Sequence, residues 1–122
     1  MKISEKIKQR LKKAGIRYHS NDNIADYINE GELQELQNEV AESFAGVLDS
    51  LVIDTDNDHN TQDTARRVAK MYVKEVFGGR FVQPPKVTAF PNMGYKSLYT
   101  SGPISIRSTC AHHFQNIVGK CW

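Results

Sequence analysis

The sequence predicts an α+β fold in which helices come first and an antiparallel sheet follows. Three segments, 2–14, 32–51 and 61–77, repeat apolar residues every three or four positions, which is the period of an amphipathic helix. In the C-terminal third, proline and glycine interrupt the chain, and residues 104–109 and 117–122 have the apolar character of short strands. Helices grouped before strands, instead of alternating with them, are typical of α+β proteins.

The helical segments are predicted from their apolar stripes and their end signals. Residues 2–14 form a basic amphipathic helix that ends at Gly15, and we interpret its lysines as a solvated face on a docking helix rather than as a contact for nucleic acid. A short helix is expected near 24–28. The apolar stripe of 32–51 predicts a core or helix–helix interface. Helix 61–77 has a cap at Thr61 or Asp63 and ends at Gly78-Gly79.

Four extended segments are expected after these helices. They are 87–90, 95–101, 104–109 and 117–122, of which the last is expected to pair back on the third as a hairpin. The polar loop after Ile53 begins like a calcium-binding loop but lacks its glycine and its final glutamate, so we expect no calcium there.

Composition excludes several classes of protein. The chain has 122 residues and a formal net charge of +2, which argues against a general nucleic-acid binder. No apolar run reaches the roughly 20 residues of a membrane span, and the N-terminus has no signal-peptide core. Only Cys110 and Cys121 occur, so no disulfide framework is predicted. We therefore expect a single domain of the cytoplasm, without nucleic-acid or membrane partners.

A thiol and two imidazoles occupy four consecutive positions and form the candidate functional site. Cys110 and His113 have the Cys-x-x-His spacing of two ligands on one zinc ion, provided that a tight turn joins them. His112 then points elsewhere and stays available for proton transfer near neutral pH. The alternative, a buried cysteine beside surface histidines, stays open on spacing alone.

Two sequence blocks resemble the GTP cyclohydrolase I family, over about residues 33–122. The first, residues 102–114, is similar to a strand followed by the family's Ser-x-Cys-Glu-His-His core. The second resembles the family's Asp-Thr-Pro-x-Arg-Val-Ala-Lys-Met-Tyr helix start and reads Asp63-Thr64-Ala65-Arg66-Arg67-Val68-Ala69-Lys70-Met71-Tyr72. The resemblance implies a zinc-dependent hydrolase that converts GTP to 7,8-dihydroneopterin triphosphate and formate, although the pathway that uses the product stays open.

The resemblance also assigns residues and architecture. It implies zinc ligation by Cys110 and His113, catalysis by His112, and binding of the substrate triphosphate by Arg67 and Lys70. It further implies the tunnelling fold (T-fold), whose subunit sheets join in a homo-oligomer, typically a decamer. On this basis residues 1–31 are a helical extension, and residues 32–122 are the N-terminal portion of a GTP cyclohydrolase I-like domain.

Three departures from the family pattern define a second hypothesis. The family's glutamate after the metal cysteine is Ala111, and the family's third zinc ligand and its guanine-reading carboxylate lie beyond Trp122. We therefore expect a fold that is truncated at its C-terminus. Cys121 is either a substitute third ligand across the hairpin or a strand residue of the core. The alternative to an enzyme is a non-catalytic homologue that acts only through subunit assembly.

Overall fold

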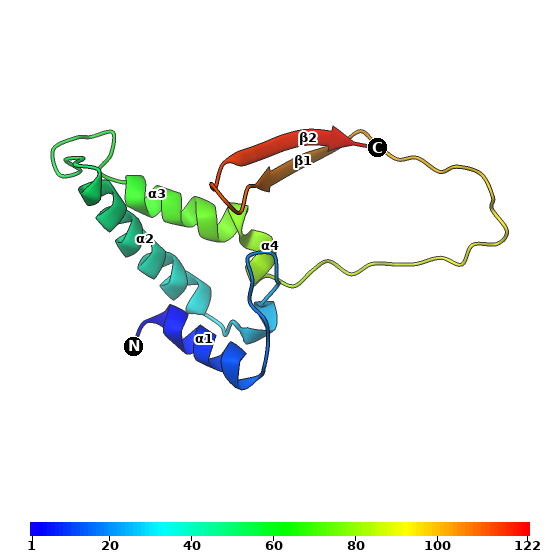
Figure 1. Cartoon of the computed structure of the whole chain (residues 1–122), viewed down its shortest axis with the longest axis horizontal. Helices are drawn as coiled ribbons and strands as arrows, with labels where there is room; N and C mark the ends of the chain where they lie inside the picture. The colour runs from blue at the N-terminus through cyan, green and yellow to red at the C-terminus, as the bar shows by residue number, and fades with distance from the viewer. The chain divides into compact units, whose positions relative to one another are not determined.

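The computed structural model describes all residues from Met1 to Trp122 and divides them into two compact units. The first unit is Met1–Pro84 and contains every helix; the second is Pro85–Trp122 and contains both strands. The helices-then-strands order confirms the α+β prediction (Figure 1). The boundary that we predicted between residues 31 and 32 stays a prediction. No helix of the chain has both the length and the apolarity needed to cross a bilayer.

The helical unit follows the predicted segments closely. Its elements are α1 (Ile3–Lys13), a 3₁₀ turn (Ala25–Tyr27), α2 (Glu32–Ser50), α3 (Thr64–Met71), a π-helical turn (Tyr72–Val76) and α4 (Gly78–Phe81). Gly15 adopts a φ of 66° after α1, as expected of a residue that ends a helix in the left-handed region.

The core of the helical unit lies beneath α1. Ile3, Ile7 and Leu11 repeat at four-residue steps, and all three are buried together with Ile24 from the following loop. Leu11 is only 1% exposed. Because a helix this short is marginal alone, burial of this stripe is the main source of its stability.

Two polar contacts fix α1 against α2 with the helices antiparallel. The backbone N–H and hydroxyl of Ser4 donate to the Glu39 carboxylate at 3.0 and 2.6 Å. At the other end, the Arg10 guanidinium pairs with Glu32 at 2.5 Å. Glu39 thereby satisfies a backbone donor in the first turn of α1, where such donors have no partner within the helix.

The α2 and α3 helices run side by side (Figure 1) and are joined by an aromatic contact. Phe44 stacks on Tyr72 with ring centroids 5.5 Å apart, and Ala69 and Val73 are buried nearby on the α3 side. The apolar stripe that we predicted along α2 is only partly covered, since Val47 is 49% exposed.

Arg80 anchors α4 to the loop that follows α1. Its guanidinium donates to the carbonyls of Tyr18 at 3.0 Å and Asp22 at 2.8 Å, and to that of His19. In return, the Asn23 side-chain amide donates to the Gly79 and Val82 carbonyls, both at 2.7 Å. Residues about 60 positions apart in sequence are thus held by hydrogen bonds, so the N-terminal segment is an integral part of this unit.

The predicted ends of the third helix are partly wrong. Asp63 precedes α3 but makes no capping hydrogen bond, because its carboxylate binds Arg66 instead, at 2.6 Å. The other end is confirmed, because α3 continues as the π-helical turn to Val76 and is capped at Phe77. The two glycines then begin the separate short helix α4, which was not predicted and whose docking by Arg80 outweighs the low helix propensity of glycine.

The second unit is an antiparallel hairpin preceded by a long segment without regular structure. Strands β1 (Ile104–Thr109) and β2 (Asn116–Cys121) pair from Ile104 opposite Cys121 to Thr109 opposite Asn116, which confirms the predicted hairpin. The strands predicted at 87–90 and 95–101 are absent. Within this unit neither segment has a pairing partner, and an isolated strand has no ladder to stabilise it.

Candidate metal site and phosphate-binding helix

A tight turn between β1 and β2 carries the candidate chemistry. The Phe114 N–H donates to the Cys110 carbonyl at 2.8 Å, and the Cys110 N–H donates to the Gln115 carbonyl at 2.9 Å. Phe114 adopts a φ of 53°, a left-handed conformation that is uncommon for an aromatic residue. The chain between the strands is therefore curled back on itself, which is the condition that the Cys-x-x-His spacing requires.

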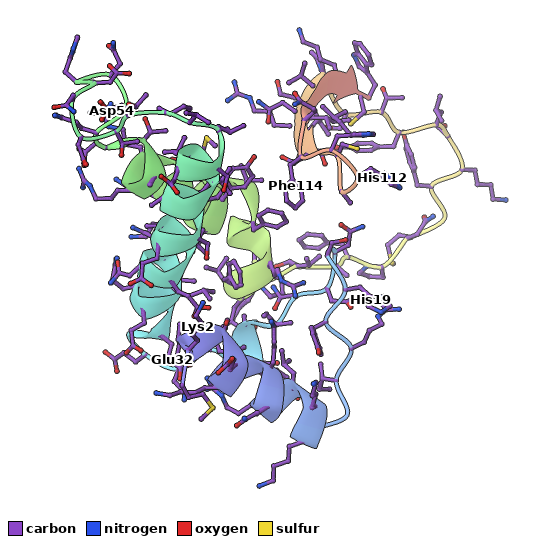
Figure 2. The ribbon with its side chains drawn as sticks, turned by 60° about the vertical axis from the view of Figure 1, so that its left-hand side comes forward. Lys2, His19, Glu32, Asp54, His112 and Phe114 are labelled. Carbon is purple, nitrogen blue, oxygen red and sulfur yellow. The ribbon has the colours of Figure 1, made fainter.

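The turn brings both imidazoles to the thiol. The Cys110 sulfur lies 4.0 Å from Nδ1 of His113 and 3.8 Å from Nδ1 of His112. Figure 2 labels His112 in this turn. The prediction that His112 points away from the cysteine is therefore wrong. Successive side chains point to opposite faces only in a flat strand. In this turn, the side chains of His112 and His113 both lie near the Cys110 sulfur.

The donor set fits one zinc ion. A tetrahedral zinc at about 2.3 Å from sulfur and 2.0 Å from nitrogen separates those two atoms by roughly 3.5 Å. The Cys110–His113 pair lies within about half an ångström of that separation, so a small side-chain adjustment suffices. Sulfur and imidazole nitrogen are also the donors that zinc prefers. Cys110 is partly buried, while both histidines are exposed.

Apart from His112, the chain places no further donor beside this pair. No group of three or more His, Cys, Asp or Glu side chains has an arrangement that holds a metal ion. Cys121 lies opposite Ile104, at the far end of the hairpin from the turn. Five residue steps at about 3.3 Å separate the two ends of each strand. Cys121 of the same hairpin is therefore too distant to be the third ligand, and that alternative is wrong.

The two predicted phosphate-binding residues lie on α3, in the helical unit. Arg67 and Lys70 are three residues apart, so they share one face of the helix, and both are exposed. Arg67 lies 4.0 Å from Asp63, with 74% of its side chain exposed, so its guanidinium is available to an anion. These residues and the Cys110 turn belong to different units, and the structure describes each group by itself.

Asp63 organises the cations at the start of α3. The hydrogen bonds from Arg66, and after them its positive charge, hold the pKa of the Asp63 carboxyl below its usual value. Arg66 is thereby committed to an ion pair, which leaves Arg67 in the middle of α3 and Lys70 in its last turn as the exposed cations of this face. The sequence analysis missed this division of roles; the i, i+3 spacing of Asp63 and Arg66 was the signal for it.

Comparison with known proteins places these features in one family. A family model described as GTP cyclohydrolase I matches residues 40–122, which includes α3 and the whole hairpin. A GTP cyclohydrolase 1 from Yersinia enterocolitica is 40% identical over 83 residues, covering 66% of this chain and 37% of that protein. One from Shewanella baltica is 35% identical over 88 residues, covering 70% and 40%, and one from an Enterobacter species is 36% identical over 95 residues, covering 72% and 42%.

The structure thus defines an α+β protein with a cysteine–histidine turn and with two exposed cations on one face of α3. The family match spans more than half of the chain and contains every predicted site residue. The chain therefore belongs to the GTP cyclohydrolase I family. It spans about two fifths of the length of the curated relatives that it matches.

Proposed function

We propose that this chain contributes the zinc-binding turn and the triphosphate-binding helix of a GTP cyclohydrolase I. The reaction converts GTP and water to 7,8-dihydroneopterin triphosphate and formate. The observation that carries the proposal is the approach of the Cys110 sulfur and the His113 Nδ1 to 4.0 Å within one turn. The family membership supplies the class of substrate.

Cys110 and His113 are the proposed zinc ligands. The metal, when bound, supplies an activated water at neutral pH. The protein must hold both ligands in place, and two backbone hydrogen bonds close the turn that contains them. A third ligand is required for a catalytic zinc, and it comes from outside the residues of this turn.

His112 is the proposed proton carrier. An imidazole exchanges protons near neutral pH, and the reaction requires protons to move as the five-membered ring of guanine opens and formate departs. His112 lies beside the proposed metal position, since its Nδ1 is 3.8 Å from the ligand sulfur. It is thus within reach of a substrate held at the zinc.

Arg67 and Lys70 are the proposed triphosphate ligands. A guanidinium meets phosphate oxygens with two parallel hydrogen bonds, and an ammonium adds a point charge beside it. Both side chains are exposed on one face of α3, Arg67 in the middle of the helix and Lys70 in its last turn. Binding of the triphosphate orients the guanine ring for attack.

We also propose the tunnelling fold and a homo-oligomer, for which a decamer is the expectation from the family. The hairpin supports this, because both of its strands have an open edge and expose apolar side chains such as Ile106 and Val118. Unpaired edges of this kind are normally covered by another strand. In the same proposal, residues 1–31 precede the catalytic domain.

The direct test is turnover of GTP by the purified protein with zinc. Formate release and a pterin that becomes fluorescent after oxidation are expected, and a His112→Ala variant that still binds zinc is expected to lose both. Ala111, in place of the family's glutamate, favours the alternative of a non-catalytic homologue that acts by assembly. That alternative is supported instead if zinc binds and neither product forms in the wild-type protein.

A further inference from the structure

The unit Pro85–Trp122 carries positive side-chain charge that none of its own side chains neutralises. It contains no Asp or Glu, and its Lys and Arg residues are Lys86, Lys96, Arg107 and Lys120. None of these four cations forms an ion pair, because every ion pair of the chain lies between residues 10 and 67. All four are exposed, so their charges are available to an anion from outside the chain.

The register of the hairpin places two of these cations on one face. Strands β1 and β2 lie side by side (Figure 1), with Arg107 opposite Val118 and Lys120 opposite Ser105. Because alternate residues of a strand share a face, Arg107 and Lys120 are diagonal neighbours on the same face. Such neighbours are about 7–8 Å apart, which long side chains can bridge. One anion can therefore contact both cations.

The remaining side chains of this face are mostly polar. The Arg107 face, as we call it, consists of Ser105, Arg107 and Thr109 from β1 and of Asn116, Val118 and Lys120 from β2. It offers two hydroxyl groups and one amide beside the two cations, and Val118 is its one apolar residue. The opposite face carries the apolar residues Ile104, Ile106 and Ile117. The two faces of the hairpin thus differ in chemistry, and only one of them suits an anion.

Two like charges on neighbouring strands repel each other and weaken the pairing of those strands. An anion bound between Arg107 and Lys120 reverses the sign of this contribution, because each cation then gains an opposite charge. The hairpin alone contains no carboxylate that could do this. The positions of Arg107 and Lys120 are therefore those of a binding pair for an external anion.

A phosphate group matches the donors of the Arg107 face. A guanidinium donates two parallel hydrogen bonds to phosphate oxygens, and an ammonium adds a compact charge with donors of its own. The hydroxyls of Ser105 and Thr109 can donate to the oxygens that remain. A carboxylate has only two oxygens, and a bidentate guanidinium already occupies both, whereas a phosphate group has oxygens left for Lys120.

We propose that Arg107 and Lys120 form a phosphate-binding site on the hairpin, for the phosphate group of a small molecule. The site belongs to the unit Pro85–Trp122, whereas Arg67 and Lys70 belong to the helical unit. It goes beyond the proposed catalytic function and requires neither zinc nor turnover. Its ligand is either a nucleotide or a free phosphate compound such as pyrophosphate, which share the chemistry that the site recognises.

The face is too small for a nucleic-acid track. A polyanion gains affinity by contacting many phosphates in succession, and the Arg107 face has two cations. The other two cations of the unit, Lys86 and Lys96, lie in the segment without regular structure and add no cation to the hairpin. Two cations match one phosphate or pyrophosphate group.

The test is a titration of the full chain with pyrophosphate, followed residue by residue through the amide signals in nuclear magnetic resonance. The protein carries Arg67→Ala and Lys70→Ala, so that α3 does not compete for the ligand. We expect saturable shifts of the amide signals of β1 and β2. Adding Arg107→Gln and Lys120→Gln is expected to weaken the affinity about tenfold or more, because two charge-assisted contacts are lost.

Two further variants separate a defined site from general charge. Lys86→Gln with Lys96→Gln removes the same charge from the same unit and is expected to leave the affinity nearly unchanged. Arg107→Lys keeps the charge but loses the planar fork, so an intermediate affinity is expected. Cross-strand amide contacts in each variant show whether the hairpin is intact.

Guanosine and its 5′-monophosphate distinguish the two sources of phosphate. Hairpin shifts with the monophosphate and none with guanosine would assign the site to a nucleotide. Shifts with pyrophosphate alone would assign it to a free phosphate compound. Both results support a phosphate site on the Arg107 face.

Three results would overturn the proposal. The first is an absence of saturable hairpin shifts with every phosphate compound. The second is equal weakening by the two glutamine double variants, which would indicate diffuse charge. The third is tighter binding of a short single-stranded oligonucleotide than of pyrophosphate at Arg107 and Lys120, which would assign the face to nucleic acid. Zinc binding and GTP turnover are measured in the protein with Arg67 and Lys70 intact, so a failure here leaves the catalytic proposal standing.

Discussion

The Ser4 hydroxyl donates a hydrogen bond of 2.6 Å to the Glu39 carboxylate, and the Ser4 backbone N–H donates a second one of 3.0 Å. One carboxylate of α2 thus accepts two hydrogen bonds from the first turn of α1, although Ser4 and Glu39 are 35 residues apart in the sequence. This contact and the Arg10–Glu32 pair determine how the N-terminal helix lies on the helical unit.

Because of the Glu39 contact, the free energy of unfolding is expected to decrease at acid pH. Burial alone would raise the pKa of Glu39, but the hydrogen bonds from Ser4 and the charges of Lys2 and Lys8 together hold it below its usual value of 4.5. A depressed pKa contributes stability that is present above pH 4.5 and is lost as the pH falls through the folded-state pKa. We expect Glu39→Gln to lower the free energy of unfolding by about 1–2 kcal/mol at pH 7.

The measurement is chemical denaturation monitored by circular dichroism from pH 7 down to pH 3. The variant is expected to show a smaller loss of stability over this range than the wild-type protein. Glu42→Gln is the control, because Glu42 is exposed and has no ion pair. Equal pH dependence of wild type and Glu39→Gln would show that this carboxylate does not stabilise the fold.

The core beneath α1 is expected to be sensitive to cavities. Leu11 is 1% exposed and packs in the cluster with Ile7 and Ile24. We expect Leu11→Ala to reduce the free energy of unfolding by about 2–5 kcal/mol. Val47→Ala, at a side chain that is 49% exposed, is expected to cost much less, and denaturant titration of both variants measures the difference. Equal costs would contradict the position of the core.

The hairpin is expected to depend on Gly102. Its φ of 149° lies in a region that side chains rarely adopt, and a Cβ there would lie 2.8 Å from the Cys121 carbonyl and 3.0 Å from Trp122. Gly102→Ala is therefore expected to loosen the pairing of Ile104 with Cys121. Amide hydrogen exchange of β2 measures this, with Gly94→Ala, where nothing lies within 4 Å, as the control at a second positive φ. Equal exchange in the two variants would contradict this close approach.

The proposed roles of Arg67 and Lys70 predict which alanine substitutions weaken the binding of a GTP analogue. Arg67→Ala and Lys70→Ala are each expected to weaken binding of a GTP analogue about tenfold or more, since each loses a charge-assisted contact. Lys74→Ala is the matched control, because Lys74 is an exposed cation four residues after Lys70 with no proposed contact. Titration calorimetry gives the affinities. Equal weakening by all three would indicate a diffuse cationic surface instead of two ligands.

Local pattern predicted much of the fold, and non-local contacts account for what it missed. The periodicity of Ile3, Ile7 and Leu11 gave α1 almost to the residue. The short helix α4 was not predicted, because Arg80, bound to carbonyls some 60 residues earlier, holds glycines in a helical turn. Residues 87–90 and 95–101 have strand composition but no partner strand in their unit. Composition predicts the tendency to extend, whereas a strand requires a neighbour.

The candidate site was likewise predicted only in part from the local spacing of residues. Spacing alone predicted that Cys110 and His113 approach each other, because three-residue separation closes in a turn. It did not predict that His112 also lies beside the thiol, since the path of the turn depends on the left-handed Phe114. The exclusion of Cys121 as a ligand required the register of the hairpin, which composition does not contain.

Titration of the purified protein with cobalt(II), a spectroscopic substitute for zinc, tests the central claim most directly. A thiolate-to-cobalt absorption band is expected, displaced by zinc, absent in Cys110→Ser and unchanged in Cys121→Ser. His113→Ala is expected to weaken cobalt affinity about tenfold or more beyond the effect of His112→Ala, because His113 is the proposed direct ligand and His112 is only its neighbour. An unchanged band in Cys110→Ser, or equal affinities for the two histidine variants, would contradict the proposed zinc site.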